Sequence, residues 1–140
     1  MKNVLILISL LIGSFASVGQ SPAPHTTYTQ KNSPKLVVKP AISKKILHEV
    51  ASGKAYLIDV RTPEEYAEKH LKYAQNINIR SEKFASEINT LSKKKKIYLY
   101  CRSGNRSGKA ADTLQTFGYR LGINIGGLDS LVTNGLPLDK

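Results

Sequence analysis

Residues 97–107 read IYLYCRSGNRS and carry a clear signal of local structure. Its four leading residues match a short buried strand that ends at Cys101, the only cysteine of the chain. A loop with one glycine, Gly104, follows, and the apolar spacing after Ser107 predicts a helix that ends at Gly118. The residues expected on the buried face of that helix are Ala110, Leu114 and Phe117. The stretch therefore predicts a strand, a tight loop and a helix, with a cysteine where the strand ends.

Short apolar runs and helical patterns alternate along the rest of the chain. The other expected strands are 36–38, 55–58, 74–79 and 119–125. Helices are expected to begin at a Ser43 cap, at a capping box of Thr62 and Glu65, near Ser81 and after Gly127. This alternation predicts an α/β fold with a central parallel five-stranded sheet and helices on both faces. Ligand sites in such sheets lie beyond the carboxyl ends of the strands, where Cys101 falls.

The loop after Cys101 has the features of an anion pocket. Successive backbone N–H groups of a short loop can point inward, and the following helix adds the positive end of its dipole. Arg102, Arg106 and Lys109 add positive charge. These influences favour the thiolate, so we expect the pKa of Cys101 to lie below the usual value of about 8.5.

A lone cysteine also has a simpler interpretation, as a small buried apolar residue. The end of a strand, a glycine in the loop and flanking arginines are instead what an activated thiolate requires. We therefore interpret Cys101 as a nucleophile.

The first 35 residues predict a leader and a tether. Residues 1–19 run from a charged start through an apolar stretch to small residues, which is the order of a cleaved signal peptide. The apolar stretch is shorter than the roughly 20 residues that span a bilayer, so no stable membrane insertion is expected. The polar, proline-containing residues 20–35 predict a flexible linker, and residues 36–140 predict one domain. The mature protein is expected to be periplasmic or secreted.

Composition narrows the classes of partner. The chain has a formal net charge of +11, which suits anionic small molecules or acidic partners. No nucleic-acid motif accompanies the charge, so nucleic acid is not expected as a partner. One cysteine and three scattered histidines give no ligand cluster, so no metal is expected, and a single cysteine allows no internal disulfide.

The motifs of the chain, taken together and in order, resemble the single-domain rhodanese-like proteins. The segments that carry the resemblance are LIDVRTPEEY at 57–66, His70 with AQNIN at 74–78, YCRSGNRS at 100–107 and GGL at 126–128. The likeness extends from about Leu36 to Pro137. It implies the three-layer fold of that family for this domain.

The resemblance implies transfer of sulfane sulfur through a persulfide on Cys101, as in a thiosulfate sulfurtransferase. An anionic sulfur donor, thiosulfate or a polysulfide, is the expected first substrate, and cyanide or a thiol is the expected acceptor. Covalent catalysis of this kind needs no cofactor. The residues expected to bind substrate are Arg102, Ser103, Gly104, Asn105, Arg106 and Ser107. Asp59 and Arg61 are expected to support the site structurally, and His70 is interpreted as structural too.

Two other functions fit parts of the pattern. Cysteine-dependent phosphatases and arsenate reductases of related fold also place a cysteine in an anion-binding loop, but they need a longer loop than the four residues between Cys101 and Arg106. The smaller loop suits a single sulfur atom. A domain that only binds sulfur or delivers it to a dedicated partner, without free turnover, is the second alternative.

Overall fold

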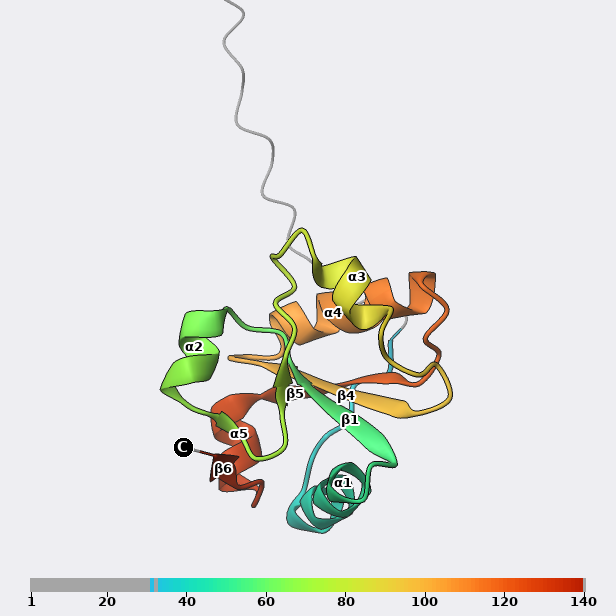
Figure 1. Ribbon diagram of the computed structural model, residues 1–140. Coiled ribbons are helices and arrows are strands. Elements are labelled where there is room, and N and C mark those ends of the chain that lie inside the picture. Colours follow the sequence, from blue (N-terminus) through green and yellow to red (C-terminus); the bar gives the residue numbers. More distant parts are fainter. Residues whose placement is uncertain (1–30, 32, 140) are drawn as a thin grey trace, which may run out of the picture.

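The computed structural model describes residues 31 and 33–139, in which a central sheet lies between two layers of helices (Figure 1). The helices are α1 (Pro40–Ala51), α2 (Pro63–Glu68), α3 (Phe84–Ile88), α4 (Asn105–Thr116) and α5 (Leu128–Thr133). The strands are β1 (Ala55–Asp59), β2 (His70–Leu71), β3 (Gln75–Asn76), β4 (Lys96–Cys101), β5 (Gly122–Gly127) and β6 (Leu138–Asp139).

The central sheet has the strand order β3-β1-β4-β5, and every neighbouring pair is parallel. Helices α3 and α4 cover one face, and α1 and α5 cover the other (Figure 1). The expected α/β fold with a parallel sheet between helical layers is therefore confirmed. In this order β4 is an inner strand, and its carboxyl end carries Cys101.

The sequence of β4 accounts for its central position. Successive side chains of a strand point to opposite faces, so a strand with helices on both sides must be apolar at nearly every position. Leu99 and Cys101 lie in the core beneath α3 and α4, whereas Tyr98 and Tyr100 lie in the core beneath α1 and α5. Cys101 therefore points toward the side of the sheet that α4 covers.

Three expected strands differ from the observed ones. Residues 36–38 form no strand, and the nearby bridge joins Lys35 to Asn124, so the described sheet has four strands instead of five. The backbone N–H of Leu36 still donates to the Asn124 carbonyl, at 2.9 Å, but Pro40 starts α1 shortly afterwards and the chain leaves the sheet. The strand expected at 74–79 is limited to β3, and the one expected at 119–125 begins and ends later, as β5.

Two of the predicted helix starts had different outcomes. The capping box is confirmed: Thr62 Oγ1 accepts from the Glu65 N–H, and Glu65 Oε2 accepts from the Thr62 N–H at 3.1 Å. The Ser43 cap is wrong, because α1 begins at Pro40 and Ser43 lies buried inside the helix. Proline suits the first position of a helix, where its missing N–H costs nothing.

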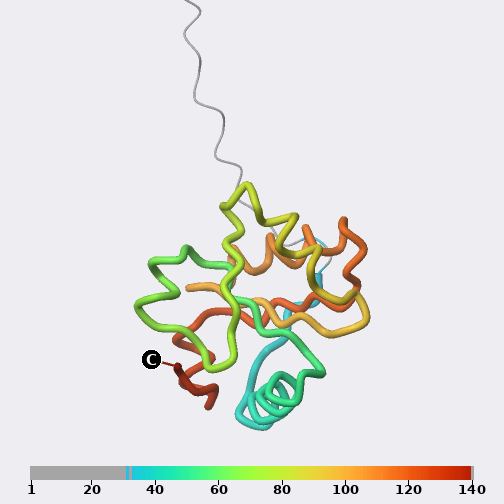
Figure 2. The backbone as a smooth tube through the Cα atoms, in the orientation of Figure 1, coloured from blue at the N-terminus to red at the C-terminus, as the bar shows by residue number. Residues whose placement is uncertain are grey.

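A small antiparallel pair, which the sequence did not predict, fixes the end of the described chain. Strand β2 pairs with β6, so that His70 faces Asp139 and Leu71 faces Leu138. Figure 2 shows the red end of the chain beside the green segment that follows α2. This pair holds residues 136–139 against the side of the domain that carries α5.

The predicted signal peptide, residues 1–19, lies outside the described residues, as does most of the predicted linker at 20–35. The described part of that linker contacts the domain: the Ser33 N–H donates to Asp112 Oδ1 of α4 at 3.1 Å. Within residues 33–139, no helix is long and apolar enough to cross a membrane.

Candidate active site

Cys101 is the last residue of β4 and is 1% exposed. Its neighbour in the sheet register is Gly127, at the end of β5. The sulfur accepts a hydrogen bond from the Gly104 N–H at 3.0 Å, and the Ser107 hydroxyl lies 3.4 Å from it. The loop expected from the sequence thus curls over the sulfur and directs hydrogen-bond donors at it.

Two opposing effects set the acidity of the Cys101 thiol. Burial raises its pKa, because a charged sulfur loses solvation. Hydrogen bonds from the Ser107 hydroxyl and from the backbone N–H groups of Ser107, Ser103 and Gly104 lower it, and together they outweigh burial. The pKa of Cys101 therefore lies below its ordinary value, which favours the nucleophilic thiolate.

The loop rests directly on the end of β5. Gly104 has a φ of +93°, a conformation that side chains other than glycine adopt with strain. A Cβ at Gly127 would lie 2.5 Å from the Arg102 carbonyl oxygen, closer than atoms can approach. The glycine at the end of β5 is therefore needed for the loop to occupy this position.

Asn124, which belongs to none of the sequence motifs, connects the parts of this loop. Its Oδ1 accepts from the Ser107 hydroxyl at 2.8 Å and from the Gly126 N–H at 3.0 Å. Its Nδ2 donates to the Gly104 carbonyl at 3.1 Å. A buried asparagine between Ile123 and Ile125, in an otherwise apolar strand, was the available signal, because buried polar groups require partners.

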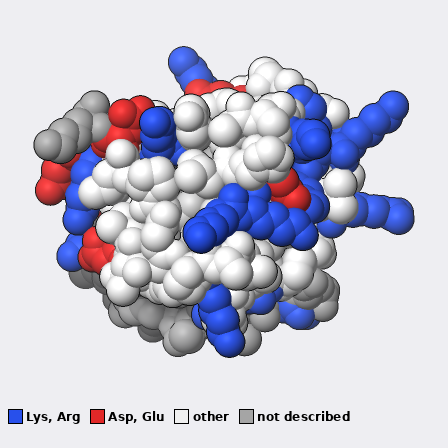
Figure 3. Space-filling model, turned by 90° about the horizontal axis from the view of Figure 1, so that it is seen from below, with Lys and Arg blue, Asp and Glu red and all other residues white. Residues whose placement is uncertain are grey.

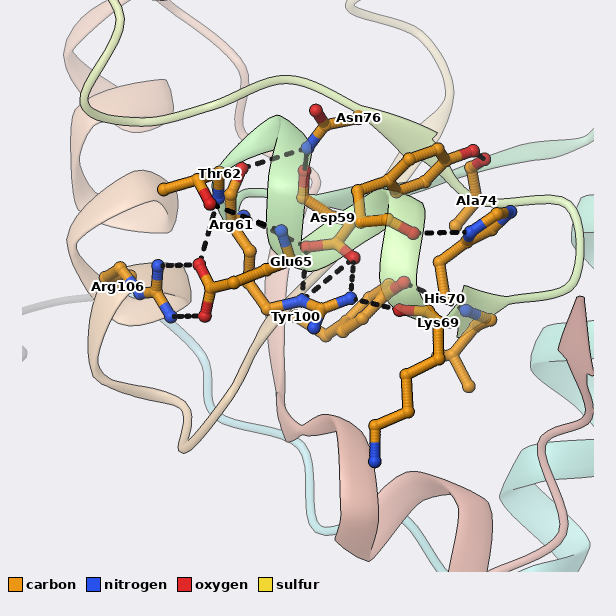
Figure 4. A network of polar contacts seen from close by, with 12 residues as sticks. Asp59, Arg61, Thr62, Glu65, Lys69, His70, Ala74, Asn76, Tyr100 and Arg106 are labelled. Carbon is orange, nitrogen blue, oxygen red and sulfur yellow. Dashed lines mark hydrogen bonds and ion pairs between the residues drawn. The ribbon is translucent and has the colours of Figure 1, made fainter. Parts of the chain in front are cut away.

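Asp59 and Arg61 form a buried ion pair behind the loop (Figure 4). Arg61 Nη2 lies 2.6 Å from Asp59 Oδ2, and the same nitrogen donates to the Lys69 carbonyl at 2.7 Å. Asp59 is fully buried and Arg61 is 4% exposed. They also contact Tyr100, whose ring centroid lies 5.9 Å from the Arg61 guanidinium carbon, so the pair joins β1 to β4 and to the chain after α2.

Arg106 pairs with Glu65, the last residue of the capping box (Figure 4). Its two terminal nitrogens donate to the two carboxylate oxygens, at 2.7 and 2.8 Å. The Arg106 guanidinium lowers the pKa of Glu65 to about 2, against the opposing effect of burial. This pair joins the start of α4 to the start of α2. It engages the guanidinium nitrogens of Arg106 that were expected to bind the sulfur donor.

The other loop side chains point toward solvent. Arg102, Ser103 and Asn105 are exposed. Arg102 lines two hollows of the surface: one of about 220 Å³, shared with Arg61 and Glu65, and one of about 530 Å³, shared with Ser103. Of the arginines that flank the cysteine, Arg102 is therefore the one that reaches open space.

His70 lies apart from the sulfur-binding loop. Its ring stacks on Tyr66 with centroids 3.8 Å apart, and Nδ1 lies 2.8 Å from the Tyr66 carbonyl (Figure 4 shows the position of His70). These contacts are those of a structural residue. Within the described ranges, no three His, Cys, Asp or Glu side chains gather into a group that could hold a metal ion.

Comparisons with known proteins agree with this geometry. The sequence model of the rhodanese-like domain matches residues 43–133. The chain is 35% identical over 74 residues to thiosulfate sulfurtransferase PspE of Escherichia coli strain K12, which covers 53% of this chain and 71% of that protein. A solved structure described as a rhodanese with anions from E. coli is 33% identical, covers 61% of this chain and 98% of its own, and has a TM-score of 0.52. The rhodanese-like domain of the Anabaena protein Alr3790 is 19% identical, covers 78% of this chain and 79% of its own, and shares the fold with a TM-score of 0.60. The chain therefore belongs to the rhodanese-like domain family.

Proposed function

We propose that this protein moves sulfane sulfur from thiosulfate to a nucleophilic acceptor through a persulfide on Cys101. The observation that carries the proposal is the set of donors around one sulfur atom, with Gly104 N–H at 3.0 Å and the Ser107 hydroxyl at 3.4 Å. Membership of the rhodanese-like family supports sulfur transfer in general, and the similarity to the thiosulfate sulfurtransferase PspE supports thiosulfate as the donor.

The first step loads the enzyme. The Cys101 thiolate attacks the outer sulfur of thiosulfate, a bond forms between the two sulfurs, and the sulfur–sulfur bond of thiosulfate breaks. Sulfite leaves with the electron pair of that bond, and the terminal sulfur of the persulfide carries the negative charge. The loop amides that lower the pKa of the thiol also stabilise this anion.

The second step transfers the terminal sulfur of the persulfide to the acceptor. A cyanide ion or a thiolate attacks the terminal sulfur, the bond to Sγ breaks, and the electron pair returns to Cys101 as thiolate. The products are thiocyanate or a persulfide of the acceptor, and neither step needs a cofactor or an external oxidant.

Phosphate chemistry is less well supported. A phosphatase or arsenate reductase requires an arginine that is free to hold a tetrahedral oxyanion next to the cysteine. Here both terminal nitrogens of Arg106 bind Glu65, and four residues separate Arg106 from Cys101. The site therefore fits one sulfur atom better than a phosphoryl group.

Steady-state assays test the reaction class. We expect the protein to form thiocyanate from thiosulfate and cyanide over many turnovers, and Cys101→Ser to form none. Faster hydrolysis of an aryl phosphate than sulfur transfer would refute the proposal. A single turnover that then stops would identify a sulfur carrier instead.

We also propose that the protein is exported and that its leader is removed. The order of charged, apolar and small residues in 1–19 supports this, and cleavage is expected to leave a mature chain that begins between Ser17 and Ser21. N-terminal sequencing of the protein from the producing cell checks it, and a membrane-bound product that retains Met1 would contradict it.

A further inference from the structure

The larger of the two hollows beside Arg102 has a distinct composition. We call it the basic groove; it has a volume of about 530 Å³ and lies between residues 35–39, the loop residues Arg102 and Ser103, and Gly126 and Gly127 of β5. Gly127 is the residue that neighbours Cys101 in the sheet register. Through Arg102 and Ser103, the groove borders the loop that curls over the sulfur.

Every ionisable side chain that lines the basic groove is a cation. These side chains are Lys35, Lys39 and Arg102. The smaller hollow on the other side of Arg102 differs, because it includes Glu65, Glu68 and Asp129. Figure 3 shows that, among charged side chains, Lys and Arg also cover more than Asp and Glu of the outer face that carries α1 and α5. The groove thus complements a negatively charged ligand.

An exposed apolar side chain stands among these cations. Val37 is 71% exposed and lines the groove between Lys35 and Lys39. Small anions and small hydrophilic thiols have no apolar surface to bury against this side chain. A peptide segment with acidic and apolar side chains uses both the charges and the valine, because interfaces combine an apolar centre with complementary charges at the rim.

We propose that the basic groove binds the sulfur acceptor, and that this acceptor is an acidic protein segment that carries a cysteine thiol. The proposal rests on the proposed function, since it requires a persulfide on Cys101. The acceptor thiol loses its proton to solvent, and its thiolate attacks the terminal sulfur. The bond to Cys101 Sγ breaks, Sγ keeps the electron pair as thiolate, and the segment leaves as its own persulfide.

Three synthetic peptides of equal length test the proposal, with one central cysteine flanked by valine and then by aspartates, serines or lysines. The protein is loaded with thiosulfate, and the rate of persulfide transfer to each peptide is measured. Neighbouring lysines lower the pKa of a thiol and aspartates raise it, so intrinsic reactivity favours the lysine peptide. The groove predicts the reverse order, with the aspartate peptide fastest, and an advantage that shrinks as salt screens the charges.

Charge reversal of the groove lysines tests whether the preference for the aspartate peptide arises in the basic groove. In Lys35→Glu/Lys39→Glu, the rate with the aspartate peptide, divided by the rate with cyanide, is expected to fall about tenfold or more. The matched control is Lys54→Glu/Lys94→Glu, which makes the same change of charge at exposed residues before β1 and β4, at the end of these strands opposite to Cys101. In the control, the ratio and the order of the peptides are expected to stay as in the wild type. Val37→Ala is expected to lower the ratio by up to about tenfold, because it removes part of an apolar contact.

Several results would overturn the proposal. They are a lysine peptide that reacts fastest with the wild type, an equal loss in the two charge-reversal variants, and a neutral small thiol that is used as fast as the aspartate peptide. A protein that takes up no sulfur from thiosulfate fails earlier, at loading, so failure of the proposed function is distinguishable from failure of the groove.

Discussion

The Ser107 hydroxyl lies 2.8 Å from Oδ1 of Asn124 and 3.4 Å from the sulfur of Cys101. The hydroxyl has one proton for these two acceptors. Asn124 therefore holds the Ser107 side chain beside the sulfur and shares its hydrogen bond. Because Asn124 also binds Gly104, whose N–H donates to the sulfur, one buried side chain positions two of the donors around the thiolate.

Ser107→Ala tests the contribution of the hydroxyl to the thiolate. The hydroxyl lowers the pKa of Cys101, so its loss should raise that pKa and reduce the thiolate fraction at neutral pH. We expect kcat/KM for thiosulfate to fall about tenfold at neutral pH, which corresponds to the weaker end of the free energy of a hydrogen bond to a charged group. At high pH, kcat/KM should recover. The pH dependence of Cys101 alkylation measures the shift directly. An unchanged alkylation profile would show that the hydroxyl serves Asn124 alone.

Gly127→Ala tests the close contact between the loop and the end of β5. The new Cβ would lie 2.5 Å from the Arg102 carbonyl oxygen, so the loop has to move away from the strand. We expect a cost of about 1–3 kcal/mol in the free energy of unfolding and a large loss of sulfur transfer. Urea denaturation and the thiocyanate assay measure the two effects.

Gly135→Ala is the matched control for that variant. Gly135 has a φ of +98°, so alanine costs about 1–2 kcal/mol there through backbone strain, but nothing lies within 4 Å of the new Cβ. We expect Gly135→Ala to keep wild-type transfer at a temperature where it is folded. Equal loss of transfer in both variants would mean that stability, and not the position of the loop, limits activity.

Glu65→Gln tests the ion pair between α2 and α4. Arg106 lowers the pKa of Glu65 from 4.5 to about 2 in the folded protein, so the pair stabilises the fold above the unfolded pKa and is lost as the pH falls through the folded one. Because both side chains are partly exposed, we expect Glu65→Gln to cost about 1–2 kcal/mol at neutral pH. The difference from the wild type should shrink between pH 4.5 and about 2. Denaturation at a series of pH values checks this, and a constant difference down to pH 2 would contradict it.

Two variants, Arg102→Ala and Arg106→Ala, test whether each arginine binds the anionic sulfur donor or activates the Cys101 thiolate. Arg102 reaches open space next to the loop, so its loss should weaken the use of thiosulfate about ten- to a hundredfold more than that of an uncharged sulfur donor. Arg106 is bound to Glu65, and a selective effect on thiosulfate in Arg106→Ala requires that this pair opens. Equal losses for both donors that recover at high pH would show that an arginine activates the thiolate without binding the donor.

The features that the sequence predicted well are local ones. The capping box at Thr62 and Glu65, the strand before Cys101 and the helix after the loop each depend on residues close together in the chain. Ser43 was misassigned because two local signals compete, and proline at the first position of α1 prevailed over the serine cap.

The features that the sequence did not predict depend on distant residues. Glu65 and Arg106 are 41 residues apart, and the pairing of β2 with β6 joins segments that give no strand pattern of their own. The expected strand at 36–38 has suitable residues, but the chain turns into α1 after a single bridge. The role of Asn124 depends on the fold, since its partners come from the loop after Cys101, the first turn of α4 and the end of β5.

Intact mass of the protein before and after thiosulfate tests the central claim most directly. Cys101 is the only thiol of the chain, so a persulfide has one place to form. We predict a gain of the mass of one sulfur atom, its removal by cyanide, and neither change in Cys101→Ser. A wild-type mass that thiosulfate leaves unchanged, or a Cys101→Ser variant that gains the same mass, would contradict it.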